Sequence, residues 1–386
     1  MRIAFDVGPL LNGNKTGIGF YEHEIVTELI QKKKQDKFYF QFFAFRNKEN
    51  KKKMLEKYIS DNVEIDACEW FPGVLYRILM SFLYFPYHLF FKKNPDITHF
   101  VNFCIPPGVK GKKVVTIHDM TFKVYPETMR NKTKILLQLN IKKSIKRADK
   151  IIADSEFTKS EIQKYYNIET DKIAVVPCGI DFNVFHPDYM IDEIEQTKQK
   201  YEIQGKYFLY LGTLEPRKNL KRLILAFAMF CKKQKQENCP NLVLAGGKGW
   251  KYEEIFLAAK ECGVEHKIKF IGYVPDEDVP RLMSGADVFC FPSLYEGFGM
   301  PPLEAMACGV PVLTSNCSSL AEVVGDAAIT VDPNSVEAIA GGMQRLWENP
   351  ELGAQLREKG LKQAQKYSWE NAAEKLYDVY EELCRE

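Results

Sequence analysis

Two glutamates separated by seven residues, Glu296 and Glu304, form the strongest chemical signal in the 386-residue chain. They lie in residues 293–309, which read SLYEGFGMPPLEAMACG and follow an apolar run typical of a buried strand. Two consecutive prolines fit the start of a helix, where a missing N–H costs little, and Gly309 fits its end. The pattern therefore predicts Glu296 in a loop beyond the carboxyl end of a strand and Glu304 in the first turn of a helix.

This arrangement favours a polar, phosphate-bearing ligand. Open α/β sheets bind ligands beyond the carboxyl ends of their strands, and Gly297 and Gly299 would let a ligand approach the backbone closely. A helix start presents unpaired N–H groups to a phosphate, and Glu304 could reach a ribose diol. A carboxylate that only complements the helix dipole would explain Glu304, but not the two glycines and the second glutamate beside it.

A second signal places two cations after a glycine turn. Residues 211–219 read LGTLEPRKN and follow the apolar run 207–211. At a strand end, Arg217 and Lys218 could stabilise a departing diphosphate, because fixed cations act most strongly where charge grows in the transition state.

Two weaker signals lie in the first half of the chain. His118 ends the run VVTIH, and Asp119 directly after it could orient the imidazole ring. Taken alone, such a histidine is more often a structural residue. Residues 16–22, TGIGFYE, place Gly17 and Gly19 after the first strand, but the glutamate at position 22 breaks the dinucleotide fingerprint. A plain turn that opens a helix remains an alternative there.

The Glu296–Glu304 segment resembles the retaining glycosyltransferases of family 4, which have two Rossmann-like domains with a cleft between them. The resemblance extends to GYVPDE at 272–277, GVPVLTSN at 309–316 and EVVGDA at 322–327, and more loosely to the first half. It implies that Glu296 contacts the transferred sugar and that Glu304 contacts the nucleotide ribose. The further donor-binding residues that it implies are Tyr273, Val274, Phe298, Gly299, Met300 and Pro301.

The resemblance also gives roles to the residues of the first half. His118 would line the acceptor side of the donor sugar, because family members carry a histidine at the matching strand end. Gly17 and Gly19 would belong to a glycine loop that closes over the diphosphate.

The cation motif departs from the family pattern at one position. Family members place an arginine directly after the glycine, where this chain has Thr213, and a lysine a few residues further on. Lys218 corresponds to that lysine, and Arg217 is the candidate for the arginine's work. The catalytic set implied is then His118, Lys218 and Glu296. This stretch is most similar to the branch that includes bacterial mannosyltransferases.

The activity implied is the retaining transfer of a hexose, with mannose from GDP-mannose as the donor group. The acceptor would be a glycan or lipid-linked intermediate of cell-surface polysaccharide synthesis. A sugar-nucleotide epimerase of the same fold and a non-catalytic scaffold that binds sugar nucleotides remain alternatives. No cofactor or metal is expected, because the D-x-D at residues 276–278 opens a helix and fits N-capping.

Alternating apolar runs and helical patterns predict two α/β, doubly wound Rossmann-like domains. We expect an acceptor-side domain over residues 1–190 and a sugar-nucleotide-binding domain over 191–368, with a last helix at about 369–386 that could pack back on the first. The predicted strands are Ile3–Val7, Phe38–Phe45, Val114–Ile117, Ile151–Ala153, Ile173–Val176, Tyr207–Leu211, Leu242–Ala245, Ile268–Ile271, Val288–Phe291 and Val312–Thr314.

Charge is distributed unevenly along the chain, whose net charge is +2. Residues 1–185 hold 30 Lys+Arg against 21 Asp+Glu. This excess indicates either a solvated lysine surface or an anionic partner: a phosphorylated acceptor, an anionic membrane face or nucleic acid. The predicted activity does not involve nucleic acid, so we expect no nucleic-acid partner. Residues 70–93 are apolar and aromatic but too short to span a membrane, which takes about 20 residues. They are either a buried helix or an element at the membrane interface.

The ten cysteines include no C-x-x-C pair, and the N-terminus reads as a buried strand, not as a signal peptide. We therefore expect free cysteines in a reducing, cytoplasmic compartment, at the inner face of the membrane if the interfacial interpretation of residues 70–93 holds.

Overall fold

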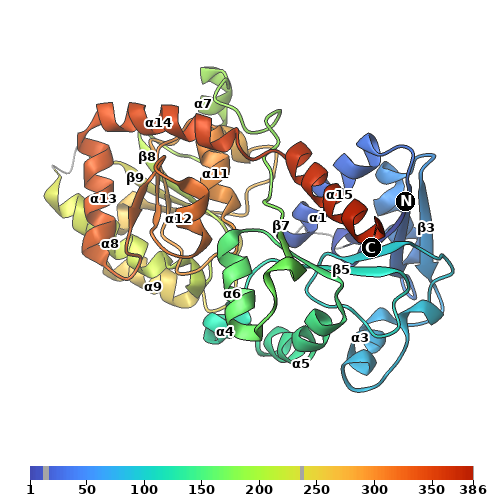
Figure 1. The fold of residues 1–386 in the computed structure, drawn as a ribbon. Helices are drawn as coiled ribbons and strands as arrows, with labels where there is room; N and C mark the ends of the chain where they lie inside the picture. Colours follow the sequence, from blue (N-terminus) through green and yellow to red (C-terminus); the bar gives the residue numbers. More distant parts are fainter. Residues whose placement is uncertain (12–16, 235–238, 386) are drawn as a thin grey trace. The chain divides into compact units, whose positions relative to one another are not determined.

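The computed structural model describes residues 1–11, 17–234 and 239–385, and contains two parallel β-sheets flanked by helices (Figure 1). The chain divides into two units, each built around one sheet. The first unit comprises Met1–Val124, Asn131–Gly179 and Trp369–Glu386, and the second comprises Tyr125–Arg130 and Ile180–Ser368.

The sheet of the first unit has the strand order β3-β2-β1-β4-β5-β6-β7, and all its pairings are parallel. Its strands are β1 (Arg2–Asp6), β2 (Lys37–Phe43), β3 (Val63–Cys68), β4 (Ile97–Phe100), β5 (Lys112–Ile117), β6 (Lys150–Ala153) and β7 (Ile173–Val175). Its helices are α1 (Gly17–Lys32), α2 (Lys48–Leu55), α3 (Gly73–Phe82), α4 (Thr121–Val124), α5 (Asn131–Arg147), α6 (Glu156–Tyr166) and α15 (Trp369–Arg385).

The sheet of the second unit has the order β10-β9-β8-β11-β12-β13, the doubly wound order of a dinucleotide-binding fold. Its strands are β8 (Tyr207–Leu211), β9 (Asn241–Ala245), β10 (Ile268–Gly272), β11 (Val288–Phe291), β12 (Val312–Ser315) and β13 (Ile329–Val331). Its helices are α7 (Ile191–Lys200), α8 (Leu220–Lys233), α9 (Glu253–Glu261), α10 (Val279–Ser284), α11 (Met300–Ala307), α12 (Ser318–Val324), α13 (Val336–Glu348) and α14 (Pro350–Ala364).

The strands form where the sequence has short, continuous apolar runs, because strands of a parallel sheet are buried on both faces. All four residues of β11 are buried. The ten predicted strands are confirmed, with ends that differ by at most two residues. Three further strands were not predicted. Polar residues alternate along β3, β4 contains a histidine, and β13 has three residues at a sheet edge.

The division between the units falls earlier than the sequence suggested. We placed the boundary after residue 190, but the second unit already includes Ile180. The reason is a parallel bridge between Ile180 and Ser368, with a hydrogen bond from the Ile180 N–H to the Tyr367 carbonyl at 3.2 Å. These contacts tie the chain to the second unit at the crossings 179–180 and 368–369.

The last helix, α15, lies in the first unit beside α1 (Figure 1). Its first residue, Trp369, contacts the rings of Phe20 and Tyr21 on α1, with centroids 6.2 and 5.8 Å away. Further along, the Tyr380 hydroxyl forms a 2.5 Å hydrogen bond with Nδ1 of buried His99 on β4. Burial lowers the pKa of His99 to about 3, so this core histidine is neutral.

Residues 70–93 form α3 and irregular segments around it. On α3 itself, Tyr76 and Met80 are buried, whereas Ile78 and Phe82 are exposed. Among the described residues, no helix combines the length and the apolar character that a membrane crossing requires.

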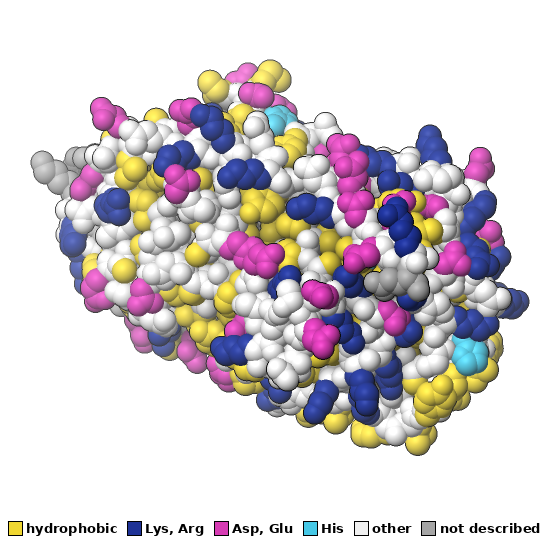
Figure 2. Space-filling model, viewed as in Figure 1, with side chains coloured by type: hydrophobic (Ala, Val, Ile, Leu, Met, Phe, Trp, Pro, Cys, Tyr) yellow, Lys and Arg dark blue, Asp and Glu magenta, His cyan; other side chains and the backbone are white. Residues whose placement is uncertain are grey.

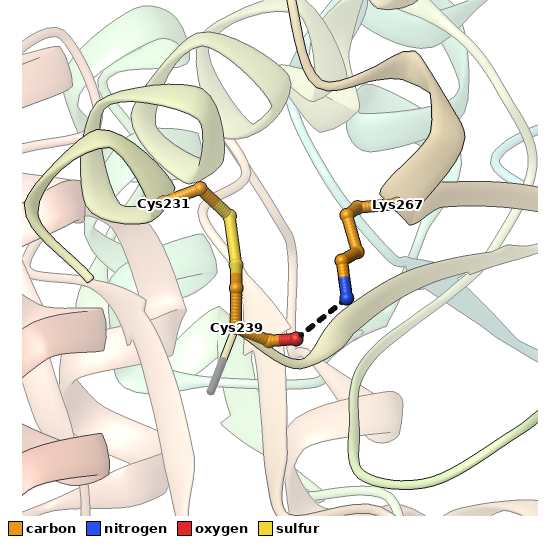
Figure 3. Close-up of a disulfide and its surroundings, with 3 residues drawn as sticks. All are labelled: Cys231, Cys239 and Lys267. Atoms are coloured by element: carbon orange, nitrogen blue, oxygen red, sulfur yellow. Dashed lines mark hydrogen bonds between the residues drawn. A yellow bond between two sulfur atoms is a disulfide. The ribbon is translucent and has the colours of Figure 1, made fainter. Parts of the chain in front are cut away.

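One cysteine pair contradicts the expectation that all ten are free. Cys231, in the last turn of α8, and Cys239, just before β9, form a disulfide with Cα atoms 5.8 Å apart (Figure 3). The Lys267 ammonium donates to the carbonyl of Cys239 at 3.1 Å. The two cysteines are eight residues apart in sequence, and this spacing matches no motif that would have predicted the bond.

We expect this disulfide to be visible by counting thiols. Alkylation of the denatured protein without reductant should label eight cysteines, and all ten after reduction, because the other eight are free. Mass spectrometry of the intact protein measures both numbers. Ten labelled thiols before reduction would show that the pair is not bonded in solution.

Candidate active site

In the second unit, the strand order reverses between β8 and β11, and the cation motif and the Glu296 motif follow these two strands. Such a reversal opens a crevice at the carboxyl ends of the strands, where ligands bind. Arg217 and Lys218 form a 3₁₀ turn after β8, and Glu296 lies in the loop after β11. The topology therefore brings together two motifs that are about 80 residues apart in sequence.

Glu296 is held between the two cations. Its Oε1 accepts a hydrogen bond from the Lys218 ammonium at 2.7 Å, and its Oε2 accepts one from Nη1 of Arg217, also at 2.7 Å. Burial alone would raise the pKa of the Glu296 carboxyl, but Arg217 and Lys218 outweigh it and lower this pKa to about 2. Glu296 is therefore an anion throughout the neutral range.

Asn219 fixes the turn that carries the cations. It has a left-handed backbone conformation, with φ of 62°. Its side-chain amide donates to the carbonyls of Pro292 at 3.0 Å and Pro333 at 2.7 Å. The N–H of Leu294 donates to the Arg217 carbonyl at 2.9 Å. The turn after β8 and the loop after β11 are thus joined by both side-chain and backbone bonds.

Two serines at the start of α12 order the loop of Glu296, and sequence reasoning missed both. The Ser319 hydroxyl lies within hydrogen-bonding distance of the carbonyls of Glu296 and Phe298, at 2.9 and 2.8 Å. The hydroxyl of Ser318 accepts from the Glu296 N–H at 3.2 Å. No motif marks these serines in the sequence, because their role depends on the approach of α12.

Gly299 precedes α11 in a conformation that favours glycine. Its φ is +107°, and a Cβ there would lie 2.6 Å from Cδ2 of Leu320. Met300 and Pro301 then begin the helix. Pro301 and Pro302 have no N–H, so the amides that the loop can offer to a phosphate are those of Phe298, Gly299 and Met300, fewer than a regular helix start provides.

Glu304 lies slightly further into its helix than predicted. We expected it in the first turn of a helix that begins with the two prolines, but α11 already begins at Met300, so Glu304 is its fifth residue, at the start of the second turn, and is 9% exposed. Burial, together with repulsion from Asp276, raises the pKa of the Glu304 carboxyl to about 7. Among the described residues, no cation pairs with Glu304 as Arg217 and Lys218 pair with Glu296, so the two carboxyls have opposite pKa shifts.

The D-x-D at residues 276–278 does not cap a helix with its side chains. Asp278 occupies the position before α10, but its carboxylate makes no cap hydrogen bond. Its Oδ2 instead accepts from the Lys200 ammonium and the Tyr201 hydroxyl, both at 2.6 Å. These partners on and just after α7 compete successfully with the backbone N–H groups of α10, so the N-capping prediction is wrong.

The remaining predicted donor residues lie around the same edge of the sheet. Tyr273 is exposed and Val274 is buried, directly after β10. Phe298 is buried against the ring of Tyr367, with centroids 5.6 Å apart. Thr213, at the position of the family arginine, is exposed.

In the first unit, His118 follows β5 and is oriented by a residue that we did not predict. Its Nδ1 donates to the Asp154 carboxylate at 2.7 Å, and its Nε2 donates to the Val101 carbonyl at 2.7 Å. Asp119, which we expected in this role, instead accepts from the N–H of Thr121. Asp154 directly follows the predicted strand Ile151–Ala153, so the strand-end rule could have found it.

These contacts favour a charged imidazole. A ring that donates from both nitrogens is an imidazolium. Burial opposes the charge, but Asp154 and the Val101 carbonyl outweigh it and raise the pKa of His118.

The predicted glycine loop lies at the start of α1. Gly17 and Gly19 are in the first turn of the helix, and Thr16 lies outside the described residues. Tyr21, one helical turn after Gly17, packs edge-on against the His118 ring, with centroids 5.0 Å apart. The start of α1 and His118 therefore share one region of the first unit.

A cavity of about 360 Å³ lies at the strand-order reversal of the first sheet, between β1 and β4. Asp6, at the end of β1, and Arg77, on α3, line it together with Tyr76, Tyr87 and Asn102. Burial raises the pKa of Asp6, and the Arg77 guanidinium partly offsets this effect. The Tyr87 hydroxyl is buried and has no hydrogen-bond partner among the described residues. The cavity thus combines aromatic walls with polar groups open to a ligand.

The fold is that of the GT-B glycosyltransferases. The structure resembles sucrose-phosphate synthase from Thermosynechococcus elongatus, with a TM-score of 0.76 over 99% of both chains at 18% identity.

The sequence gives the family. Residues 26–184 match the family described as Glycosyltransferase Family 4, and residues 192–363 match Glycosyl transferases group 1. The chain is 35% identical over 291 residues to O-antigen chain mannosyltransferase B of Escherichia coli, which covers 74% of each chain. It is 30% identical over 298 residues to a serotype-specific mannosyltransferase of Escherichia coli, covering 72% of this chain and 36% of that longer one. The chain therefore belongs to the GT4-like glycosyltransferases.

Proposed function

We propose that this glycosyltransferase moves mannose from GDP-mannose to a glycan or lipid-linked acceptor, with retention of the anomeric configuration. The observation that carries the proposal is the pair of cations that hold Glu296 at the carboxyl edge of the second sheet. The names of the two mannosyltransferase relatives support the choice of mannose and of a cell-surface polysaccharide as the product.

In the mechanism that we propose, Lys218 and Arg217 stabilise the negative charge that grows on the departing diphosphate. Arg217 does the work of the arginine that the family carries at the position of Thr213. The amides of Phe298, Gly299 and Met300 add neutral hydrogen-bond donors.

Because the protein's own cations supply this positive charge, the proposal includes no metal requirement. The rate of transfer in EDTA should therefore equal the rate without EDTA.

Glu296 has a binding role in this mechanism and is not a nucleophile. A carboxylate whose pKa is about 2 is a weak base, and both its oxygens already accept charged hydrogen bonds. It can accept further hydrogen bonds from sugar hydroxyls through remaining lone pairs. The acceptor hydroxyl attacks C1 as the C1–O bond to the diphosphate breaks on the same face, and its proton passes to a phosphate oxygen. No covalent sugar–enzyme intermediate forms.

The donor and the stereochemistry have direct tests. Among sugar nucleotides, GDP-mannose should raise the melting temperature most. A ligand that binds only the folded state adds about 2.7 kcal/mol of stability at 100 times its dissociation constant. NMR of the product should show an α-mannosyl linkage. A β-linkage would rule out retention. Conversion of the donor to an epimer without any acceptor would point to the epimerase alternative instead.

We assign the cavity of the first unit to the acceptor sugar. Carbohydrates offer hydroxyls for charged hydrogen bonds and apolar ring faces for aromatic packing, and Asp6, Arg77 and Tyr76 present both kinds of group. Its volume of about 360 Å³ falls in the range of small-molecule sites.

Arg77→Ala should raise the KM for the acceptor by roughly tenfold or more, the loss expected for a hydrogen bond to a charged group. Hydrolysis of the donor in the absence of acceptor should not change, because Arg77 belongs to the first unit and the cations that hold the donor belong to the second. Arg345→Ala, at an exposed position on α13, is the matched control. An unchanged acceptor KM, or an equal loss of donor hydrolysis, would remove the cavity from the acceptor site.

A further inference from the structure

Two adjacent segments of the first unit contain no acidic residue. Residues 70–93, which include α3, hold no Asp or Glu, and neither does α5. The two segments together contain nine Lys and Arg. They are joined directly: Ser81 accepts a hydrogen bond from the side-chain amide of Asn140 at 2.8 Å, and its carbonyl accepts one from the Lys143 ammonium at 2.6 Å.

Large apolar side chains are exposed on the same two segments. Figure 2 shows hydrophobic side chains gathered over α3, at the lower right, with Lys and Arg beside them over α5. We call this the α3–α5 surface. Its exposed apolar residues are Val74, Leu75, Ile78 and Phe82 on α3, Leu83 and Tyr84 directly after it, and Ile135 and Leu139 on α5.

The outer side of α3 has no role in the cavity beneath it. Tyr76, Arg77 and Met80 line the acceptor cavity, whereas Ile78 and Phe82 do not. Phe82 is 71% exposed and Ile78 is 49% exposed. Monomeric proteins rarely expose a contiguous apolar patch without using it for binding.

We propose that the α3–α5 surface docks onto the surface of an anionic lipid bilayer. The apolar side chains would enter the headgroup region, as the apolar face of an interfacial helix does. The lysines of α5 would bind anionic headgroups, and the absence of carboxylates from both segments removes repulsion. A protein partner would need acidic groups to match these lysines and an apolar face to match α3, whereas an anionic bilayer supplies both.

Docking itself does not depend on the proposed reaction, but its purpose does. If the acceptor is lipid-linked, α3 separates the bilayer from the acceptor cavity by the thickness of one helix. A lipid-linked sugar could then enter the cavity without its lipid leaving the membrane.

Cosedimentation with vesicles of phosphatidylglycerol and phosphatidylcholine tests the proposal. The full chain should bind vesicles that contain phosphatidylglycerol, and binding should weaken as salt increases. Phe82→Glu and Ile78→Glu should each reduce the partition coefficient about tenfold or more. Each replaces an apolar side chain that would enter the bilayer with a charged one. Lys142→Gln and Lys146→Gln should each reduce it about fivefold.

Matched controls come from the second unit. Ile191, 77% exposed, pairs with Phe82, and Leu257, 52% exposed, pairs with Ile78. Ile191→Glu and Leu257→Glu should bind vesicles like the unchanged protein. The exposed Lys232 and Lys260 provide equivalent Lys→Gln controls.

Three results would overturn the proposal. The first is no binding of the unchanged chain to anionic vesicles, and the second is an equal loss of binding in the controls. The third is a dimer in size-exclusion chromatography that Phe82→Glu converts to a monomer, because the surface would then bind a second copy. None of these results bears on the donor or the anomeric outcome, so the proposed function is tested separately.

Discussion

Lys218→Ala should lower kcat by roughly 10²–10³-fold, or about 3–4 kcal/mol, as the loss of one fixed charge-stabilising contact does in other enzymes. The Lys218 side chain is only 12% exposed, and its ammonium donates to Glu296 at 2.7 Å. Its removal deletes a positive charge at the site of the leaving diphosphate. It also leaves Glu296 with Arg217 as its one close cation among the described residues. Steady-state kinetics with saturating donor and acceptor measure the effect.

Lys221→Ala is the control for this substitution. Lys221 lies on α8, one helical turn from the site, its side chain is 60% exposed, and its ammonium lies 3.7 Å from Glu254. This variant should keep the normal kcat. Glu296→Ala should also lose more than tenfold in turnover while the fold remains intact. If Lys218→Ala and Glu296→Ala both turn over at near-normal rates, the site is misplaced.

Glu304→Gln should stabilise the protein at pH 8 by up to about 3 kcal/mol and by less than about 1 kcal/mol at pH 5. Burial raises the folded-state pKa of Glu304 from 4.5 to about 7. Ionisation is therefore costly in the folded state, and the stability of the unchanged protein falls as pH rises from about 4.5 through 7. Glutamine avoids that cost. Chemical denaturation at the two pH values measures the difference.

Glu296→Gln provides a comparison with the opposite sign. In the unchanged protein, the folded-state pKa of Glu296 is lowered to about 2. The ionised carboxylate therefore stabilises the fold above pH 4.5 and loses that effect as pH falls toward 2. Glu296→Gln should therefore destabilise the protein at neutral pH. If Glu304 binds the nucleotide ribose, Glu304→Gln should also weaken GDP binding in spite of its stability. Equal stability of the Glu304 variant and the unchanged protein at both pH values would contradict the raised pKa.

The sequence was most informative where a residue follows a buried strand. Arg217, Lys218, Glu296 and His118 all follow apolar runs, and the parallel sheets carry each of them to a carboxyl edge. A local pattern is sufficient for this inference, because strand direction alone decides at which edge a loop lies.

Contacts between segments far apart in sequence were not predictable in this way. Asn219 binds the carbonyl of Pro333, and Ser319 binds the loop of Glu296, only because the sheet order brings their elements together. Asp278 was predicted as a cap from its neighbours, but its partners come from around α7. Asp6 and Arg77 belong to no motif, and their cavity follows from the position of α3 beside β1.

The position of α15 affects the order in which the protein can be made. Its Trp369 packs on α1, and its Tyr380 binds His99 within the first sheet. On the ribosome, the first unit therefore lacks residues 369–386 until the segment Ile180–Ser368 of the second unit has been synthesised. The synthesis of the first unit thus begins before that of the second and ends after it. A protease that cuts the chain only at 179–180, or only at 368–369, would release neither unit, because the other of these two crossings still joins them.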